Sequence, residues 1–180
     1  MKKLILSISI AITAYAFGQE ITLDKIYSGY YRGKSIAGIA SLKNGENYAV
    51  IEPSGIAKYS YKTSEKEGNI VDGSFQSYTF NDNESKILLL KSSEPIYRHS
   101  FLGKFDVKDL KSGKVLSLNN GNYVQEPSFS PDGSKVAFIS ENNLFYQDLK
   151  TEKITKITTE GKKNSILNGL ADWVYEEEFG

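Results

Sequence analysis

The residues best suited to chemistry are three consecutive carboxylates, Glu176, Glu177 and Glu178, close to the end of the 180-residue chain. Like charges side by side repel, so an arbitrary acidic run is usually a solvated end. The same stretch also holds three aromatic residues, Trp173, Tyr175 and Phe179. Aromatic side chains favour apolar surroundings, so we expect the carboxylates between them to lie next to a packed apolar surface. Carboxylates held there need a counter-cation, and a small ammonium group would supply both charge and hydrogen-bond donors.

Local conformation decides which of the three carboxylates can converge on one ligand. In a strand, alternate residues share a face, so Glu176 and Glu178 would point the same way. In a helical turn, neighbouring side chains lie about 100° apart, and two adjacent carboxylates can both point into a concave space. The residue types alone leave both arrangements open.

Two separate motifs in the chain resemble a known family. Residues 172–179, with residues 164–169 before them, resemble the signature of the dipeptidyl peptidase IV branch of the prolyl oligopeptidase family. The segment Tyr97-Arg98-His99-Ser100 resembles a second motif of that family. The motifs follow in the family's order, and the likeness covers nearly the whole chain after its N-terminal segment, most strongly from about Pro95 onward.

The resemblance implies that three residues bind substrate. In the family, two adjacent glutamates on a short helical segment, projecting from a β-propeller, hold the free α-amino group of a peptide. The family uses the second and third acids, which are Glu177 and Glu178 here, and Arg98 matches the Arg that binds a backbone carbonyl. Glu176 would then point elsewhere, toward a structural partner, and Trp173 would anchor the segment to the propeller.

Internal repeats predict the elements that position these residues. Three segments each read as a strand, a polar turn and a second apolar strand: 42–50, 80–90 and 129–139, the last with a Pro-Asp-Gly turn. Residues 105–115 and 145–154 form a second type of hairpin with a shared Asp-Leu-Lys sequence. Four strands in a unit of roughly 40 to 50 residues are typical of a propeller blade.

The predicted fold is therefore all-β, a partial propeller with about three to four four-stranded antiparallel blades and a short helical segment carrying the glutamates. Units begin near Ile36, Ser74 and Val124, and residues 21–32 could supply a strand of an earlier unit. Closed propellers typically have about four to eight blades, because an open arc leaves edge strands unpaired. The resemblance implies an eight-bladed propeller followed by an α/β-hydrolase domain, so residues 19–180 are interpreted as the N-terminal portion of the propeller, without that hydrolase domain.

The first residues predict export. Lys2 and Lys3 precede an apolar run over residues 4–17, which is too short for a membrane span and suits a signal peptide over residues 1–18. Cleavage after Gly18 is expected, with cleavage after Ala16 as the alternative. The expected location is the periplasm or the cell envelope. The chain has no Cys, so disulfides, thiolate zinc sites and lipid anchors on Cys are excluded.

The balanced charge and the missing catalytic residues exclude several classes of function for this chain. Lys plus Arg equal Asp plus Glu at 22 each, so no excess charge favours nucleic acid or an anionic membrane. The only His is His99, and no Gly-x-Ser-x-Gly sequence occurs, so this chain carries no Ser-His-Asp triad. His99 is expected to be structural, and neither a cofactor nor a metal site is predicted.

Three functions remain open at this stage. The favoured one is the propeller fragment of a secreted serine exopeptidase that releases dipeptides with Pro or Ala in the second position. Its expected partners are peptides with a free N-terminus and a C-terminal hydrolase domain of the same polypeptide. A prolyl tripeptidyl peptidase shares both motifs. A non-enzymatic periplasmic propeller that binds proteins is the third, although a scaffold does not require paired carboxylates facing an ammonium group. The resemblance is also consistent with a homodimer of the full-length enzyme.

Overall fold

The computed structural model describes residues 21–33 and 38–179. The chain divides into two units, Met1–Ser35 and Ile36–Gly180. The predicted signal peptide, residues 1–18, lies outside the described residues.

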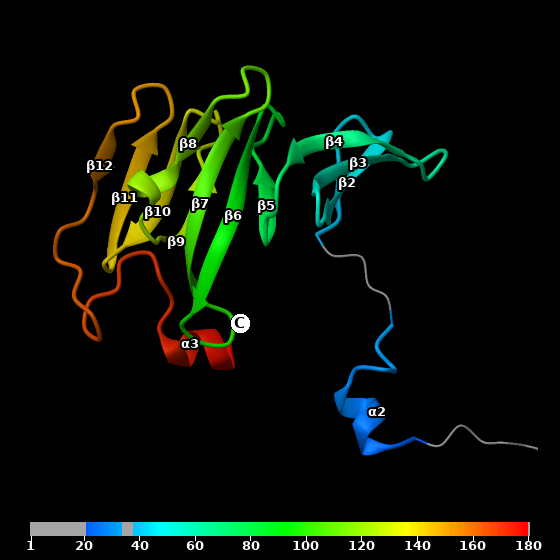
Figure 1. Cartoon of the computed structure of the whole chain (residues 1–180). Helices are drawn as coiled ribbons and strands as arrows, with labels where there is room; N and C mark the ends of the chain where they lie inside the picture. Colours follow the sequence, from blue (N-terminus) through cyan, green and yellow to red (C-terminus); the bar gives the residue numbers. More distant parts are fainter. Residues whose placement is uncertain (1–20, 34–37, 180) are drawn as a thin grey trace, which may run out of the picture. The chain divides into compact units, whose positions relative to one another are not determined.

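In the first unit, the described residues form a short helix, α2 (Leu23–Tyr27) (Figure 1). Thr22 caps this helix, because its Oγ1 accepts a hydrogen bond from the backbone N–H of Lys25 at 3.3 Å. Asp24 lies in the first turn, where a carboxylate interacts favourably with the helix dipole. The expectation of a strand within residues 21–32 is therefore wrong.

The second unit contains three four-stranded antiparallel sheets, each with its strands in sequence order (Figure 1). The first sheet comprises β1 (Ala40–Ser41), β2 (Asn47–Glu52), β3 (Gly55–Ser60) and β4 (Lys66–Asp72). The second comprises β5 (Ser77–Phe80), β6 (Lys86–Pro95), β7 (Phe101–Asp109) and β8 (Val115–Ser117). The third comprises β9 (Gln125–Phe129), β10 (Lys135–Ser140), β11 (Asn143–Asp148) and β12 (Ile154–Lys156). These sheets confirm the predicted all-β, propeller-like fold with four-stranded blades.

Two short helical elements complete the described part of this unit. A 3-10 segment, η1 (Leu118–Gly121), follows the second sheet, and α3 (Trp173–Glu178) follows the third. The helix α3 confirms that the glutamate motif lies on a short helical segment. Within residues 21–33 and 38–179, no helix has the length and apolar character that a bilayer span requires.

The middle sheet packs on both of its faces. In β6, Leu88 and Leu90 join a buried cluster with the third sheet, which contributes Val136 and Phe138. Side chains alternate along a strand, so Ile87 and Leu89 face the other way. They join a cluster with Ala49, Ile56 and Val71 of the first sheet. The unbroken apolar run in β6 therefore reflects a strand that is buried on both sides.

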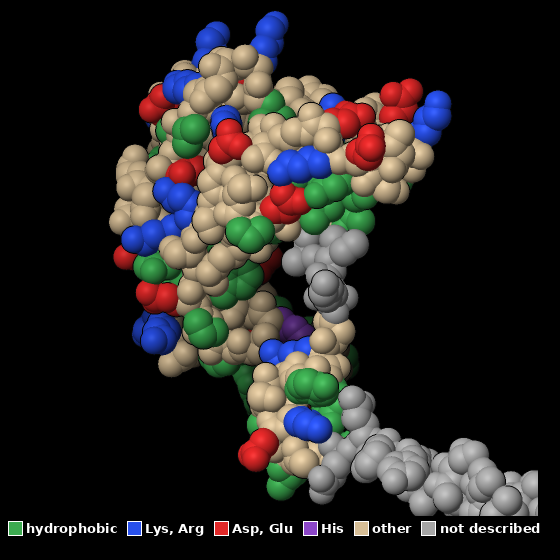
Figure 2. Space-filling model, turned by 45° about the vertical axis from the view of Figure 1, so that its right-hand side comes forward, with side chains coloured by type: hydrophobic (Ala, Val, Ile, Leu, Met, Phe, Trp, Pro, Cys, Tyr) green, Lys and Arg blue, Asp and Glu red, His purple; other side chains and the backbone are tan. Residues whose placement is uncertain are grey.

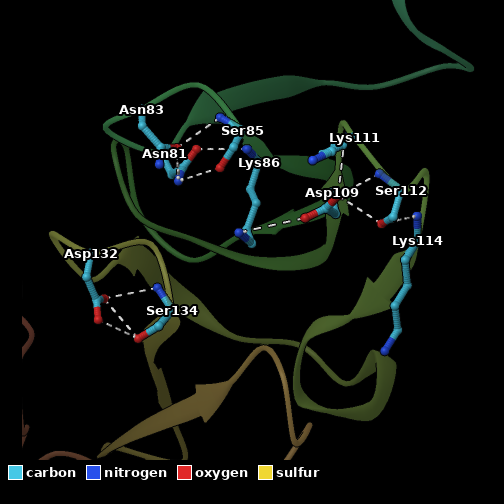
Figure 3. Close-up of polar contacts among 10 residues, drawn as sticks. All are labelled: Asn81, Asn83, Ser85, Lys86, Asp109, Lys111, Ser112, Lys114, Asp132 and Ser134. Carbon is cyan, nitrogen blue, oxygen red and sulfur yellow. Dashed lines mark hydrogen bonds and ion pairs between the residues drawn. The ribbon is translucent and has the colours of Figure 1, made fainter.

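The repeated polar residues of the hairpins build their turns. In the Asp-Leu-Lys turns, the carboxylate of Asp109 accepts hydrogen bonds from the backbone N–H groups of Lys111 and Ser112, and Asp148 accepts from the equivalent N–H groups of Lys150 and Thr151. Figure 3 shows the Asp109 turn together with the turn of Asp132, whose carboxylate accepts from Ser134. These hydrogen bonds favour the ionised form, so the pKa values of Asp109 and Asp148 are lowered. The pKa of Asp132 is lowered too, first by a hydrogen bond from Ser130 Oγ and then by those from Ser134.

Polar contacts between turns also link neighbouring sheets. The ammonium group of Lys43, in the β1–β2 turn, lies 2.7 Å from a carboxylate oxygen of Asp82, in the β5–β6 turn. Lys114 and Glu152 form a similar ion pair, also at 2.7 Å, between the second and third sheets. In the space-filling view, basic and acidic side chains alternate over the visible surface of the sheets (Figure 2). This mixture agrees with the equal numbers of basic and acidic residues in the sequence.

Candidate functional site

The glutamate-bearing helix α3 begins at a defined cap. Asp172 has an extended backbone, and its Oδ1 accepts a hydrogen bond from the backbone N–H of Tyr175 at 2.9 Å. This contact satisfies one of the N–H groups that a helix leaves unpaired in its first turn. The cap begins the helix at Trp173, so Glu176 lies in its first turn and Glu177 and Glu178 follow directly.

The Arg motif lies in the loop between β6 and β7, residues 96–100, hereafter the 96–100 loop. The two strands pair up to Pro95 and Phe101, so they hold the loop at the end of the longest hairpin described. Within it, the carbonyl oxygen of Ser100 accepts hydrogen bonds from the backbone N–H groups of Ile96 and Tyr97. Figure 1 shows this loop beside α3.

Two contacts join the loop to the helix. Glu176 Oε1 accepts hydrogen bonds from the backbone N–H groups of His99 at 2.8 Å and Ser100 at 2.9 Å. One guanidinium nitrogen of Arg98 lies 3.0 Å from Glu177 Oε2 and forms an ion pair with it. The structure thus brings together two motifs that are more than 70 residues apart in the sequence.

The three glutamates occupy different environments. The side chain of Glu177 is only 13% exposed, although its partner Arg98 is 69% exposed. Glu176 is half-buried, whereas Glu178 is exposed. Within the part of the chain that the structure describes, Glu178 has neither an ion pair nor a hydrogen-bond partner for its carboxylate. It is therefore the carboxylate most available to a ligand.

Hydrogen bonding controls the protonation of Glu176. Its partial burial acts to raise the pKa, but hydrogen bonds from His99 and Ser100 favour the charged form and lower the pKa overall. Glu176 is thus an anion at neutral pH. As predicted, it points toward a structural partner, which is the backbone of the 96–100 loop.

The expected packing of the aromatic residues is wrong. Trp173 is 54% exposed, Tyr175 63% and Phe179 75%, and α3 buries none of its residues. Tyr175 and Phe179 are four positions apart, so they lie on one side of the helix and contact each other, with ring centroids 5.2 Å apart. The described polar contacts of α3 with the loop come from carboxylates, and Trp173 does not anchor the helix in an apolar core.

The site carries a net negative charge. Three carboxylates and one guanidinium leave two net negative charges at the site, counting His99 as neutral. In the described residues, no group of three or more His, Asp and Glu side chains is placed to hold a metal ion. His99 contributes its backbone N–H to the site. The arrangement can attract an organic cation and offer it Glu178 with Glu177 beside it.

Comparison with known proteins first confirms the class, an all-β module of the propeller type. The crystal structure of Porphyromonas gingivalis dipeptidyl peptidase 4 is similar to this chain with a TM-score of 0.82 and 33% identity, covering 91% of this chain and 25% of that protein. A family model described as dipeptidyl peptidase IV N-terminal region matches residues 81–180. The chain belongs to this family.

Curated relatives belong to the same family, and this chain matches a smaller share of their length. A probable dipeptidyl-aminopeptidase B of Phaeosphaeria nodorum is 29% identical over 187 residues, covering 89% of this chain and 20% of the relative. Dipeptidyl peptidase 4 of Felis catus is 32% identical over 106 residues, covering 58% of this chain and 14% of the relative. The chain therefore spans about one fifth or less of the length of these relatives.

Proposed function

We propose that this chain is the N-terminal propeller portion of a secreted serine exopeptidase and that it binds the free N-terminus of peptide substrates. The enzyme would release dipeptides with Pro or Ala in the second position. The observation that carries the proposal is the pairing of Arg98 with Glu177 beside Glu178, whose carboxylate has no polar partner among residues 21–33 and 38–179. Family membership, and the names of the relatives, support a dipeptidyl peptidase.

The proposed binding mode follows from charge and donor geometry. A protonated α-amino group would sit between Glu177 and Glu178, whose carboxylates would accept its hydrogen bonds. The exposed guanidinium of Arg98 still has N–H groups to donate, and one of them would bind a carbonyl oxygen of the same peptide. Fixing two points of the peptide backbone selects which peptide bond reaches the nucleophile. The site would therefore set how far from the N-terminus the peptide is cleaved.

The catalytic groups would come from elsewhere in the enzyme. This chain has one His and no Gly-x-Ser-x-Gly sequence, so the nucleophilic Ser, the Asp and the His would belong to a C-terminal α/β-hydrolase domain of the same polypeptide. The charged and apolar pattern of residues 1–18 supports export to the periplasm or the cell envelope. A homodimer of the full-length enzyme is compatible with this assignment.

Peptide binding can be measured on the chain itself, because Trp173 is its only Trp and lies on α3 next to the glutamates. Titration with the tripeptide Ala-Pro-Ala should change the Trp fluorescence. N-acetyl-Ala-Pro-Ala should leave it unchanged, because acetylation removes the ammonium charge. Binding should also weaken above about pH 8, where a free α-amino group loses its proton. Equal affinity for the free and acetylated peptides would contradict the proposal.

A substitution tests the same contact. Glu178→Gln keeps the side-chain size but removes the charge, and it should weaken Ala-Pro-Ala binding roughly 30-fold or more, because one side of the ammonium loses its anion. Glu67→Gln is the matched control, since Glu67 pairs with Lys58 on the first sheet and takes no part in the site. Unchanged affinity in Glu178→Gln would argue against the assigned role of that carboxylate.

A further inference from the structure

We propose that Glu176 is a positioning residue: it fixes the backbone of the 96–100 loop and thereby holds Arg98 against Glu177. The inference rests on the function proposed above, since it concerns how the peptide site is built. It assigns a separate task to each of the three consecutive glutamates. One carboxylate holds the loop, one holds the guanidinium, and one is left for the ligand.

The geometry of Glu176 carries the inference. A single carboxylate oxygen accepts hydrogen bonds from two successive backbone N–H groups, those of His99 and Ser100, at 2.8 and 2.9 Å. Hydrogen bonds to an ionised acceptor are roughly twice as strong as neutral ones. Because His99 directly follows Arg98, these bonds fix the point from which the Arg98 side chain projects. Among the described residues, these bonds and the Arg98–Glu177 pair are the polar contacts between the loop and α3.

The ion pair alone could not fix Arg98. The Arg98 side chain is 69% exposed, although that of Glu177 is 13% exposed. Solvent therefore reaches the guanidinium and weakens the pair, and a long side chain loses conformational freedom when it is held in one position. The loop's own hydrogen bonds, from Ile96 and Tyr97 to Ser100, close the turn without connecting it to α3. Glu176 supplies that connection, so its loss should leave Arg98 free to sample other positions.

Four variants of the full chain test this role. Glu176→Ala should speed hydrogen exchange of the His99 and Ser100 amides about tenfold or more and weaken Ala-Pro-Ala binding about tenfold. Glu176→Gln should recover part of both, because an amide oxygen still accepts the two bonds. If Glu176 acts through Arg98, the double variant Glu176→Ala/Arg98→Ala should bind no more weakly than Arg98→Ala alone.

A matched control separates positioning from general destabilisation. Asp148 also holds two backbone N–H groups with its carboxylate, in the turn between β11 and β12. Asp148→Ala should therefore leave the His99 and Ser100 exchange and the peptide affinity unchanged. If it changed both as much as Glu176→Ala does, the effect of Glu176 would be merely structural.

The remaining outcomes decide between the two proposals. Normal exchange and normal affinity in Glu176→Ala would overturn the positioning role, as would losses that add fully in the double variant. If the unsubstituted chain bound neither form of the tripeptide, the proposed function would fail. The exchange rates of His99 and Ser100 would still show, independently of any ligand, whether Glu176 fixes the loop.

Discussion

At the scale of single residues, neighbouring side chains of one type differ in state because their partners differ. Glu176 is held by two backbone N–H groups, Glu177 by a guanidinium, and Glu178 has no such partner among the described residues. Hydrogen bonds to Glu176 stabilise its charge more than burial destabilises it, so its pKa is lowered. The protonation of Glu176 should therefore control whether the 96–100 loop stays attached to α3.

The pH dependence of this attachment has a definite sign. A carboxyl with a lowered pKa in the folded protein stabilises the fold fully above its unfolded value, 4.5, and this contribution is lost as pH falls through the lower folded value. The groups that act on the Glu176 carboxyl belong to His99 and Ser100 of the 96–100 loop.

An NMR titration of the backbone amides measures this effect directly. The amide protons of His99 and Ser100 should shift with a midpoint below pH 4.5, as Glu176 is protonated and releases them. In Glu176→Gln this step should be missing, because the amide does not titrate. A midpoint at or above 4.5 would show that the two hydrogen bonds do not favour the charged form.

At the scale of elements, the hairpin turns are local structures with a long-range consequence. Gly133, in the β9–β10 turn, has a positive φ of 65°, which favours glycine. A Cβ at Gly133 would meet the side-chain amide of Asn81 in the β5–β6 turn. Gly45, in the equivalent turn of the first sheet, has a similar φ of 70°, and no heavy atom lies within 4 Å of its Cβ position. The two glycines therefore separate backbone strain from contact between turns.

Replacing each glycine by alanine tests this distinction. Gly45→Ala should lower the free energy of unfolding by about 1 kcal/mol, because the only penalty is the strain of a left-handed backbone at a residue with a Cβ. Gly133→Ala should lower the free energy of unfolding by about 1 kcal/mol more, because it must also displace Asn81, whose Oδ1 accepts a hydrogen bond from the backbone N–H of Lys86. Urea unfolding measures both costs. Equal values would mean that the turn of the third sheet does not depend on Asn81.

The sequence allowed prediction of those elements whose signals are local. The Pro-Asp-Gly turn at residues 131–133 and the repeated Asp-Leu-Lys segments fix where strands end. The structure confirms the hairpins around them, β9–β10, β7–β8 and β11–β12. The helix α2 was missed because the signal of Thr22 as a cap is short and competes with a β-rich composition. The exposure of Trp173 could not be predicted, because it depends on which surfaces lie beside α3. The backbone partners of Glu176 could not be predicted either, because they are 76 and 77 residues away in the sequence.

At the scale of the whole second unit, the three sheets depend on one another through the middle one. Buried residues of β6 contribute alternately to the two apolar clusters, with Leu88 in one and Leu89 in the other. The same sheet ends in the 96–100 loop, which carries Arg98. The position of the loop therefore depends on packing that involves all three sheets.

Substitutions on opposite faces of β6 test this dependence. Leu88→Ala and Leu89→Ala should each lower the free energy of unfolding by about 2 to 5 kcal/mol, because both side chains are almost fully buried, at 3% and 2% exposure, and each deletion leaves a cavity. Val115→Ala is the control: Val115 is 52% exposed, so its replacement should change stability by about 0.5 kcal/mol or less. If only one of the two leucines proved costly when measured by urea unfolding, one face of β6 would not be packed in solution. The second unit would then behave as two adjoining sheets with a weakly attached third, and Arg98 would lose part of the support that holds it next to Glu177.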